Sequence, residues 1–350
     1  MNERIQAFVN ERGPVFCLDI GSGTQDALLA LPDTAFNNWP RWVIPSPARM
    51  ISTRIRQATR EQRNIWLYGD TMGGGFQEAV QAHIKEGYRA YATENAAKSI
   101  HDNLKTVQAM GVEICEHAPK GAMPLRVADF EPGFWTSLFA NLGLPSPNLL
   151  VASAQDHGFS LTGNRKQRME TWEHLLRQSN AVWDWIYTDV PPQLTRLRHL
   201  QNATGGCVAD TGTSALLAFL CDPNIVDRSF QEGLTLVNCG NTHILAALFY
   251  RGRICGLYEQ HTKLMDFARL DHDLHDFRLG WLPNEQVQAA FGHGTAYSVR
   301  PQEAGGFEAT FVTGPQREMF TGLGRFINPC GDMMTAGCFG LLLGMANASH

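Results

Sequence analysis

A carboxylate, two glycines and two hydroxyl side chains lie close together near the start of the chain, between two apolar segments. The run is Asp19-Ile20-Gly21-Ser22-Gly23-Thr24-Gln25-Asp26. Glycines at the end of a strand allow backbone N–H groups to approach a phosphate, and the Thr24 hydroxyl adds a donor. A carboxylate next to a phosphate requires a divalent cation between them, which is magnesium in most nucleotide sites. The run therefore indicates a phosphate-binding hairpin with a metal ion near Asp19.

This run allows two other interpretations. A dinucleotide-binding turn leads into a crossover helix of ten or more residues, whereas only residues 27–31 stand between the run and Pro32. We therefore do not expect a dinucleotide site. The glycines could also serve a tight turn alone, and the sequence leaves this interpretation open.

A second run of similar design lies in the C-terminal half of the chain. Asn238-Cys239-Gly240-Asn241-Thr242 stands between the apolar segments 236–237 and 244–248. Both runs combine an apolar strand, a polar residue at its end, a glycine turn and a second apolar strand. The repetition predicts two related half-molecules whose hairpins face one cleft.

Composition limits the classes of protein and partner. The 350 residues are 44% hydrophobic and 18% charged, which is ordinary for a soluble globular chain long enough for two domains. A net charge of −5 without a long basic run argues against a nucleic-acid partner. The N-terminus resembles no signal peptide, and the apolar segment 338–345 is too short to span a membrane. We therefore expect a cytoplasmic protein that does not bind membranes.

The order of elements along the chain predicts an α/β fold, because strands and helices alternate. We expect strands at residues 64–68 and 148–152, and a surface connection over residues 188–200, which contain Pro191-Pro192. Small-residue helices are expected at 215–220 and 335–342.

The ordered set of motifs resembles the actin-like ATPase superfamily, which includes sugar kinases, actin and the seventy-kilodalton heat-shock chaperones. The matching segments are the first phosphate loop at 19–26, the first connecting helix at 210–220, the second phosphate loop at 238–248, the adenosine loop at 312–317 and the second connecting helix at 331–343. More narrowly, residues 210–213, 238–243 and 259–262 are similar to a prokaryotic family labelled pyruvate formate-lyase activating enzyme. Radical activation of that enzyme class uses C-x-x-x-C-x-x-C, and no three of the eight cysteines have this spacing. We therefore do not expect radical chemistry.

The resemblance implies two duplicated ribonuclease-H-like α/β domains with a nucleotide cleft between them. It places the first domain at 1–221, the second at 222–330, and a C-terminal helix at 331–350 that returns to the first domain.

The resemblance also implies ATP and magnesium as cofactors. Asp19 and Asp210 are the expected metal residues, and Asp19, Asp156 and Asp210 the expected catalytic residues. The nucleotide residues implied are Gly21, Ser22, Gly23, Thr24, Gln25, Asn238, Gly240, Asn241, Thr242, Gly314, Pro315 and Arg317. Asp156 is the candidate general base, although a turn or helix-capping aspartate is an equal interpretation. Asn238 departs from the family pattern, because the second phosphate loop usually begins with aspartate.

Four residues of the second half have no assigned role. Glu259 and His261 end a predicted strand and are expected to point to the cleft. His272 and His275 have i, i+3 spacing among aspartates, which we interpret as a solvated polar helix and not as a metal site.

The function expected from this pattern is a small-molecule phosphotransferase or an activating ATPase that binds ATP with magnesium. Its partners would be a nucleotide and a small molecule of undetermined identity. The sequence also allows an oligomer. The alternative is a nucleotide- or metabolite-binding regulatory module without turnover, which the neutral Asn238 favours. An interaction protein that binds no nucleotide is the third interpretation.

Overall fold

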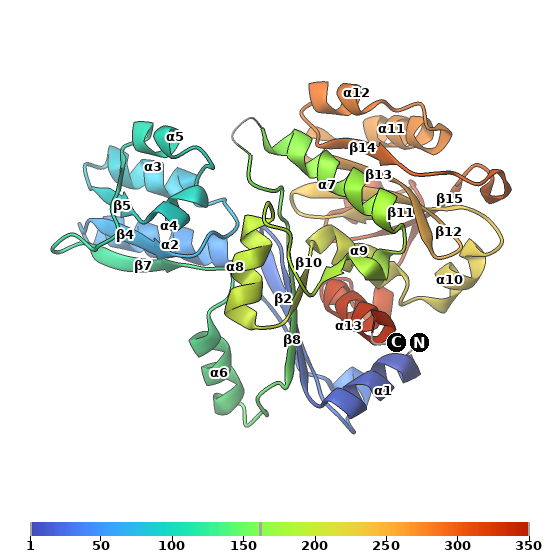
Figure 1. The fold of residues 1–350 in the computed structure, drawn as a ribbon, viewed down its shortest axis with the longest axis horizontal. Helices are drawn as coiled ribbons and strands as arrows, with labels where there is room; N and C mark the ends of the chain where they lie inside the picture. Colours follow the sequence, from blue (N-terminus) through green and yellow to red (C-terminus); the bar gives the residue numbers. More distant parts are fainter. Residues whose placement is uncertain (1, 161–162, 349–350) are drawn as a thin grey trace.

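The computed structural model describes residues 2–160 and 163–348, which form three β-sheets with helices between and around them (Figure 1). Two of the sheets lie on opposite sides of a central pair of helices. The third lies to one side of this layered body. Each sheet contributes to a hydrophobic cluster of buried side chains.

The first sheet has the strand order β3-β2-β1-β8-β10-β9. Strands β1, β2 and β3 form an antiparallel meander, β8 and β10 continue parallel to β1, and β9 is antiparallel to β10. The bounds are β1 (Val15–Ile20), β2 (Thr24–Ala30), β3 (Arg41–Pro45), β8 (Leu149–Ala154), β9 (Ile186–Tyr187) and β10 (Cys207–Ala209).

The second sheet repeats this arrangement, with the order β14-β13-β12-β11-β15-β16. Strands β11, β12 and β13 form the antiparallel meander, β15 is parallel to β11, and β16 is parallel to β15. The bounds are β11 (Leu234–Cys239), β12 (His243–Tyr250), β13 (Arg253–His261), β14 (Gly294–Tyr297), β15 (Ala309–Thr313) and β16 (Arg325–Phe326). The order β3-β2-β1-β8-β10 therefore corresponds to β13-β12-β11-β15-β16, which confirms the duplicated ribonuclease-H-like α/β fold.

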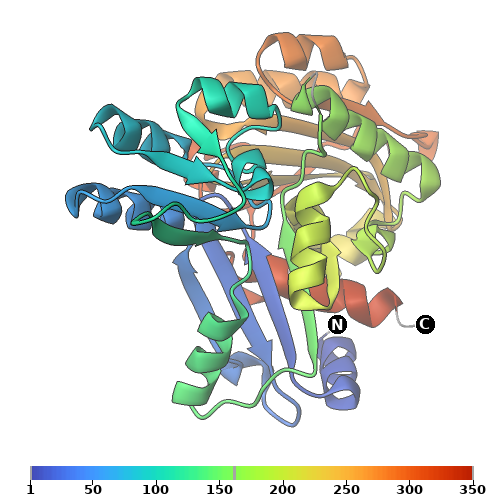
Figure 2. The same ribbon diagram turned by 60° about the vertical axis from the view of Figure 1, so that its left-hand side comes forward.

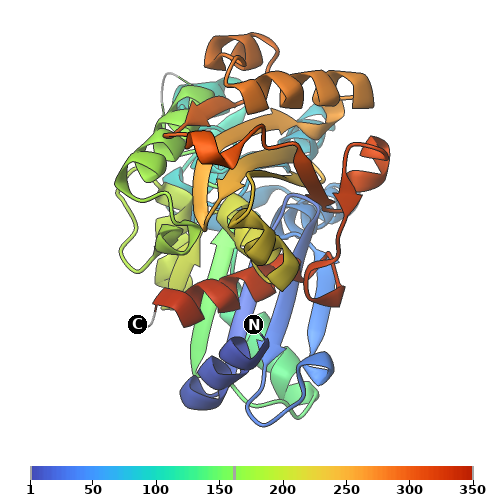
Figure 3. The ribbon, with the colours of Figure 1, turned by 90° about the vertical axis from the view of Figure 1, so that its right-hand side faces the viewer.

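Two small-residue helices, α9 (Thr211–Phe219) and α13 (Ala336–Ala348), fill the layer between the two sheets. Glycines allow their close contact, because a Cβ atom at Gly340 would lie 2.4 Å from the carbonyl oxygen of Ser214. Figure 3 shows α13 in red beside α1 (Asn2–Arg12). The C-terminal helix thus packs on elements of the first half.

The outer faces of both sheets are covered by other helices. On the first sheet these are α6 (Pro132–Asn141) and α8 (Thr195–Thr204), and on the second they are α11 (Phe267–Leu279) and α12 (Asn284–Ala289). Helix α7 (Asn164–Gln178) precedes the second half in the chain but contacts β13 and β14 of the second sheet, and α10 (Pro223–Ser229) contributes Ile225 to the central cluster. The prediction of a surface connection over 188–200 is wrong from Thr195 onward, where α8 begins. Its buried Leu197 and Leu200 follow the buried Leu194 at intervals of three residues, a helical pattern that the Pro191-Pro192 pair obscured.

A small parallel sheet is inserted between β3 and β8 (Figure 2). Its order is β6-β5-β4-β7, and its core is a separate cluster of buried side chains. The bounds are β4 (Ile65–Gly69), β5 (Ala90–Ala92), β6 (Val112–Ile114) and β7 (Met123–Val127), with α2 (Pro47–Arg60), α3 (Gln77–Lys85), α4 (Glu94–Lys98) and α5 (Leu104–Ala109). We call residues 47–127 the inserted subdomain. The sequence did not separate it from the rest of 1–221, and the predicted boundaries near 221 and 330 stay predictions.

Gly340→Ala should lower the free energy of unfolding by about 1–3 kcal/mol, because the new methyl group would meet backbone atoms of α9 that have no room to move. Urea unfolding curves measure the change. Gly133→Ala is the matched control, since Gly133 is exposed on α6 and a Cβ atom added there would have no neighbour within 4 Å. Equal stability of Gly340→Ala and the wild type would contradict this account of the packing.

Candidate functional site

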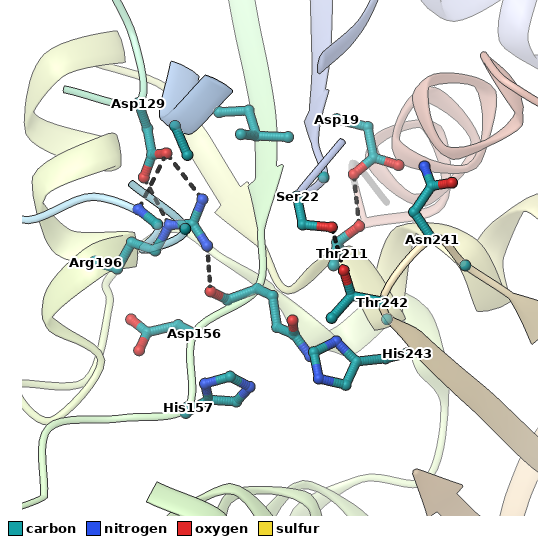
Figure 4. Close-up of a pocket in the computed structure, with 18 of the residues that line it drawn as sticks. Asp19, Ser22, Asp129, Asp156, His157, Arg196, Thr211, Asn241, Thr242 and His243 are labelled. Atoms are coloured by element: carbon teal, nitrogen blue, oxygen red, sulfur yellow. Dashed lines mark hydrogen bonds and ion pairs between the residues drawn. The ribbon is translucent and has the colours of Figure 1, made fainter. Parts of the chain in front are cut away.

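The two glycine hairpins meet at their tips, one from each half of the molecule (Figure 4). The hydroxyl of Ser22 is hydrogen-bonded to the hydroxyl of Thr242. A Cβ atom at Gly23 would lie 3.0 Å from the side-chain nitrogen of Asn241. The prediction that both hairpins face one site is therefore confirmed.

The two turns have the same internal geometry. The backbone N–H of Gly21 donates to the carbonyl of Thr24 at 2.9 Å, and that of Gly240 donates to the carbonyl of His243 at 2.9 Å. This equivalence aligns the residues of the two hairpins pair by pair, so that Asp19 corresponds to Asn238.

A cavity of about 610 Å³ lies beside the hairpins. It is lined by both halves and by the inserted subdomain. The predicted residues in its lining are Asp19, Gly21, Ser22, Thr24, Asp156, Asn238, Gly240, Asn241, Thr242, Gly314 and Pro315.

Four predicted residues do not line the cavity, and two of them form hydrogen bonds outside it. The buried Gln25 side chain donates to the carbonyl of Pro45 at 3.1 Å. Arg317 donates to Asn328 Oδ1 at 2.6 Å and to the carbonyl of Ile327. Gly23 and Asp210 also lie outside the lining. The roles predicted for these four residues stay predictions.

Asp19 is held in place by three hydroxyl groups. Its Oδ1 accepts from Ser153 at 2.6 Å and from Thr211 at 2.7 Å, and its Oδ2 accepts from Ser214 at 3.2 Å. Helix α13 approaches so closely that a Cβ atom at Gly337 would lie 2.0 Å from Oδ2. Burial raises the pKa of Asp19 more than these hydrogen bonds lower it.

Asp26 is a second carboxylate of this site, to which the sequence analysis gave no role. It pairs with Asp19 across the β1–β2 ladder, and both line the cavity. Its Oδ1 is buried and has no hydrogen-bond partner among the described residues. Burial, together with the charge of Asp19, raises the pKa of Asp26 to about 8. The i, i+7 spacing across a tight turn was the available signal, because it places both carboxylates on one face of the hairpin.

The corresponding positions of the second half carry no charge. Asn238 pairs with Leu245 across the β11–β12 ladder, where the first hairpin has Asp19 and Asp26. The acidic side chains at the base of the hairpins therefore come from the first half alone.

Asp210 takes part in a buried ion network and not in the cavity wall. Arg168 of α7 donates to Asp210 Oδ1 at 2.8 Å and to Glu259 Oε2 at 2.8 Å. Asp210 also caps α9 by accepting from the N–H of Gly212. Burial opposes ionisation of Glu259, but Arg168 outweighs it and holds the pKa of Glu259 well below its ordinary value. Both carboxylates are thus occupied by the guanidinium.

Asp156 has a capping role in the structure. Its two oxygens accept from the N–H groups of Gly158 at 2.8 Å and Leu197 at 3.0 Å, which fixes the start of α8. This geometry matches the capping interpretation, and burial raises the pKa of Asp156. The side chain still lines the cavity, so its role as a general base stays a prediction.

The inserted subdomain contributes a glycine-rich segment to the cavity. Residues 71–75, which include Gly73, Gly74 and Gly75, follow β4 and precede α3. Strands β5 and β7 flank β4 on opposite sides, so the segment lies where the strand order changes direction. In parallel α/β sheets this position is the usual place of a ligand.

The histidines divide into two groups. His272 and His275 are exposed on α11, as predicted. His157, His243 and His293 lie close together at the cleft, with His261 beside them. Of these, His261 was predicted to point to the cleft and His243 lies in the predicted second phosphate loop, whereas His157 and His293 were assigned no role.

The duplicated strand order, the facing hairpins and the cavity between the halves define a protein of the actin-like ATPase fold. The model of a family described as "Putative pyruvate format-lyase activating enzyme (DUF1786)" matches residues 72–319. The chain belongs to this family. A search of curated proteins finds no match.

Several solved structures are similar at low identity. A Bacteroides thetaiotaomicron protein with an actin-like ATPase fold is 9% identical with a TM-score of 0.38, over 96% of this chain and 97% of that one. The inorganic polyphosphate/ATP-glucomannokinase from Arthrobacter sp. strain KM is 11% identical with a TM-score of 0.35, over 97% and 100%. The activator of the 2-hydroxyisocaproyl-CoA dehydratase from Clostridium difficile, with bound ADPNP, is 10% identical with a TM-score of 0.34, over 96% of each chain. Within the described residues, no helix has the length and apolar character to cross a membrane.

Replacing Arg168 should be strongly destabilising. Arg168→Leu leaves the buried Asp210 and Glu259 without a counter-charge, and we expect a loss of about 3–5 kcal/mol in the free energy of unfolding. Arg168→Lys should recover only part of this free energy of unfolding, because one ammonium group does not reproduce the forked pairing of the guanidinium with two carboxylates. Chemical denaturation measures both. The control Arg165→Leu, on an exposed position of the same helix, should change stability by less than about 0.5 kcal/mol. Similar losses at the two positions would count against the network.

The Asp26 pKa predicts the pH dependence of stability. The folded carboxyl keeps its proton up to about pH 8, whereas the unfolded one loses it near 3.8. The folded state therefore binds more protons between these values, and stability falls as pH rises, by up to about 1.4 kcal/mol per pH unit. Asp26→Asn should flatten this slope, and Asp189→Asn, at an exposed site, should not. Urea titrations at pH 5, 6.5 and 8 in EDTA measure the slopes, and parallel curves for wild type and Asp26→Asn would refute the assignment.

Proposed function

We propose that the protein binds ATP with magnesium in the cavity beside the two hairpins and transfers a phosphoryl group to a small molecule. The observation that carries this proposal is the meeting of two equivalent glycine turns above a pair of carboxylates. The turns offer backbone donors and the hydroxyls of Ser22 and Thr242 to an anionic chain. Because these hydroxyls bond to each other, entry of phosphates between the tips requires the hairpins to separate.

The acidic pair fits a hard divalent cation. Asp19 and Asp26 offer carboxylate oxygens, the ligands that magnesium prefers, and the unpaired Oδ1 of Asp26 is available to one. Bound magnesium would neutralise negative charge on the phosphates. Ser153 and Thr211 orient Asp19 by donating to its Oδ1. Asp210 is a weaker candidate than Asp26 because Arg168 occupies both of its oxygens.

The two ends of the cavity differ in chemistry. On one side Gly314, Pro315, Met333 and Met334 line it, and this less polar end suits the adenine. Gly314 has a φ of +100°, and a Cβ atom there would lie 2.4 Å from the carbonyl of Cys239, so the position requires glycine. On the other side lie the glycine-rich segment 71–75 and residues 98–102 of the inserted subdomain, where we place the acceptor.

Asp156 is the proposed general base, between the acceptor side and the hairpins. The alternative function is a nucleotide-binding regulatory module without turnover. Two observations favour that alternative: Asn238 supplies no charge, and both Asp156 oxygens already accept backbone hydrogen bonds. Phosphate release or product formation separates the two functions.

The test combines calorimetry with an assay of ADP formation in the presence of small-molecule acceptors. Wild-type protein should bind ATP more tightly with magnesium than without it, and Asp19→Asn should lose at least tenfold of that magnesium-dependent affinity, since it removes one anionic ligand. Asp156→Asn should keep the affinity and lose ADP formation in the presence of an acceptor. Asp189→Asn, which is exposed, is the control for both measurements.

Three outcomes decide between the functions. ATP binding with magnesium that is unaffected by Asp19→Asn would refute the site. Binding without ADP formation, across a panel of small-molecule acceptors, would establish the regulatory alternative. An unchanged melting temperature and no heat of binding with ATP and magnesium would leave the interaction protein as the remaining interpretation.

A further inference from the structure

Three histidines converge at the edge of the cavity, next to the second hairpin. His157 follows β8 of the first half, His243 directly follows Thr242, and His293 immediately precedes β14. One ring nitrogen of each lies within 4.8 Å of those of the other two. Figure 4 shows the rings of His157 and His243 near each other below the hairpins. Residues far apart in sequence therefore form one cluster across the two halves.

Hydrogen bonds among the described residues leave two ring nitrogens of this cluster without a partner. Nε2 of His157 and Nδ1 of His293 are buried and have no hydrogen-bond partner among the described residues. His293 is only 3% exposed. Buried nitrogen atoms without partners cost free energy, so a bound group that uses them would stabilise the fold. Because two such nitrogens occur in one cluster, the arrangement points to a ligand.

The spacing of the rings suits a metal ion. Nε2 of His243 and Nε2 of His293 share a hydrogen bond of 3.1 Å. Once a metal ion replaces the shared proton, this separation is close to the value of about 3.3 Å that Zn–N bonds of about 2.0–2.1 Å give in a tetrahedral set. Glu259 is not available as a ligand, because its oxygens accept from Arg168, Gln155 and Trp172.

We propose that His157, His243 and His293 bind one divalent transition-metal ion of the Zn²⁺ class, which joins the two halves at the edge of the cavity. Three imidazole ligands leave a coordination position for water or for an oxygen of the acceptor, as in catalytic zinc sites. His157 and His243 line the cavity, so an ion between them would be reachable from it. This site is distinct from the carboxylate pair Asp19 and Asp26, whose oxygen ligands suit magnesium.

The experiment uses full-length protein freed of metal by a chelator and titrated with Zn²⁺ alone and with Co²⁺ alone. Calorimetry should give one tight Zn²⁺ equivalent, and Co²⁺ should give the intense visible absorption of a four-coordinate ion. His157→Gln, His243→Gln and His293→Gln should each weaken Zn²⁺ binding at least tenfold. His272→Gln, whose side chain is 67% exposed, and Asp19→Asn should bind as the wild type does.

The outcomes are separable from those of the nucleotide test, because no ATP is present. Melting curves recorded before titration identify any variant that fails to fold, and the Co²⁺ spectrum of the wild type then decides without that variant. No tight Zn²⁺ equivalent in the wild type, or equal affinity in the His243→Gln, His293→Gln double variant, would overturn the proposal. A loss with Asp19→Asn equal to that of the histidine variants would also overturn it, by assigning the ion to the carboxylates.

Discussion

The buried guanidinium of Arg168 is the constraint on which the site depends. It pairs with Asp210 of the first half and Glu259 of the second, and all three side chains are less than 10% exposed. Asp210 caps α9, whose Thr211 and Ser214 hold Asp19. On the other side, the N–H of His293 donates to the carbonyl of Glu259. Arg168 therefore positions both the carboxylate pair and the histidine cluster, because charges buried so deeply tolerate little change of geometry.

The two halves share the same hairpin backbone but differ in the side chains that face the cavity. Both hairpins have the same turn, closed by the same backbone hydrogen bond, and their tips contact each other. A tight strand–turn–strand unit restricts the backbone conformations that its turn can adopt. The residues that face the cavity differ between the two hairpins. The first half has Asp19 and Asp26, whereas the second has Asn238 and Leu245. One acidic pair suffices to hold a single cation, and a second pair would repel the phosphates that the turns are suited to bind.

Local patterns determined what could be predicted from the sequence. Glycine spacing and apolar runs predicted both hairpins and their common cleft, because a turn and its flanking strands are encoded by neighbouring residues. The inserted subdomain shared the same α/β alternation as its surroundings, so no change of pattern marked it. Helix α8 was missed because prolines precede it. The cluster of His157, His243 and His293 depends on strand pairing over long separations, which spacing alone does not reveal.

The hairpin of the second half lies between two groups of side chains, the carboxylates near Ser22 and the histidine cluster. Its tip touches Ser22 beside the carboxylates, and its last residue, Thr242, is followed at once by His243 of the histidine cluster. Oxygen ligands favour a hard cation such as magnesium, and imidazoles favour a softer one such as zinc. The two sites would therefore select different ions from the same solution. Because His243 directly follows Thr242, a movement of the hairpin tip away from Ser22 would also move the imidazole of His243.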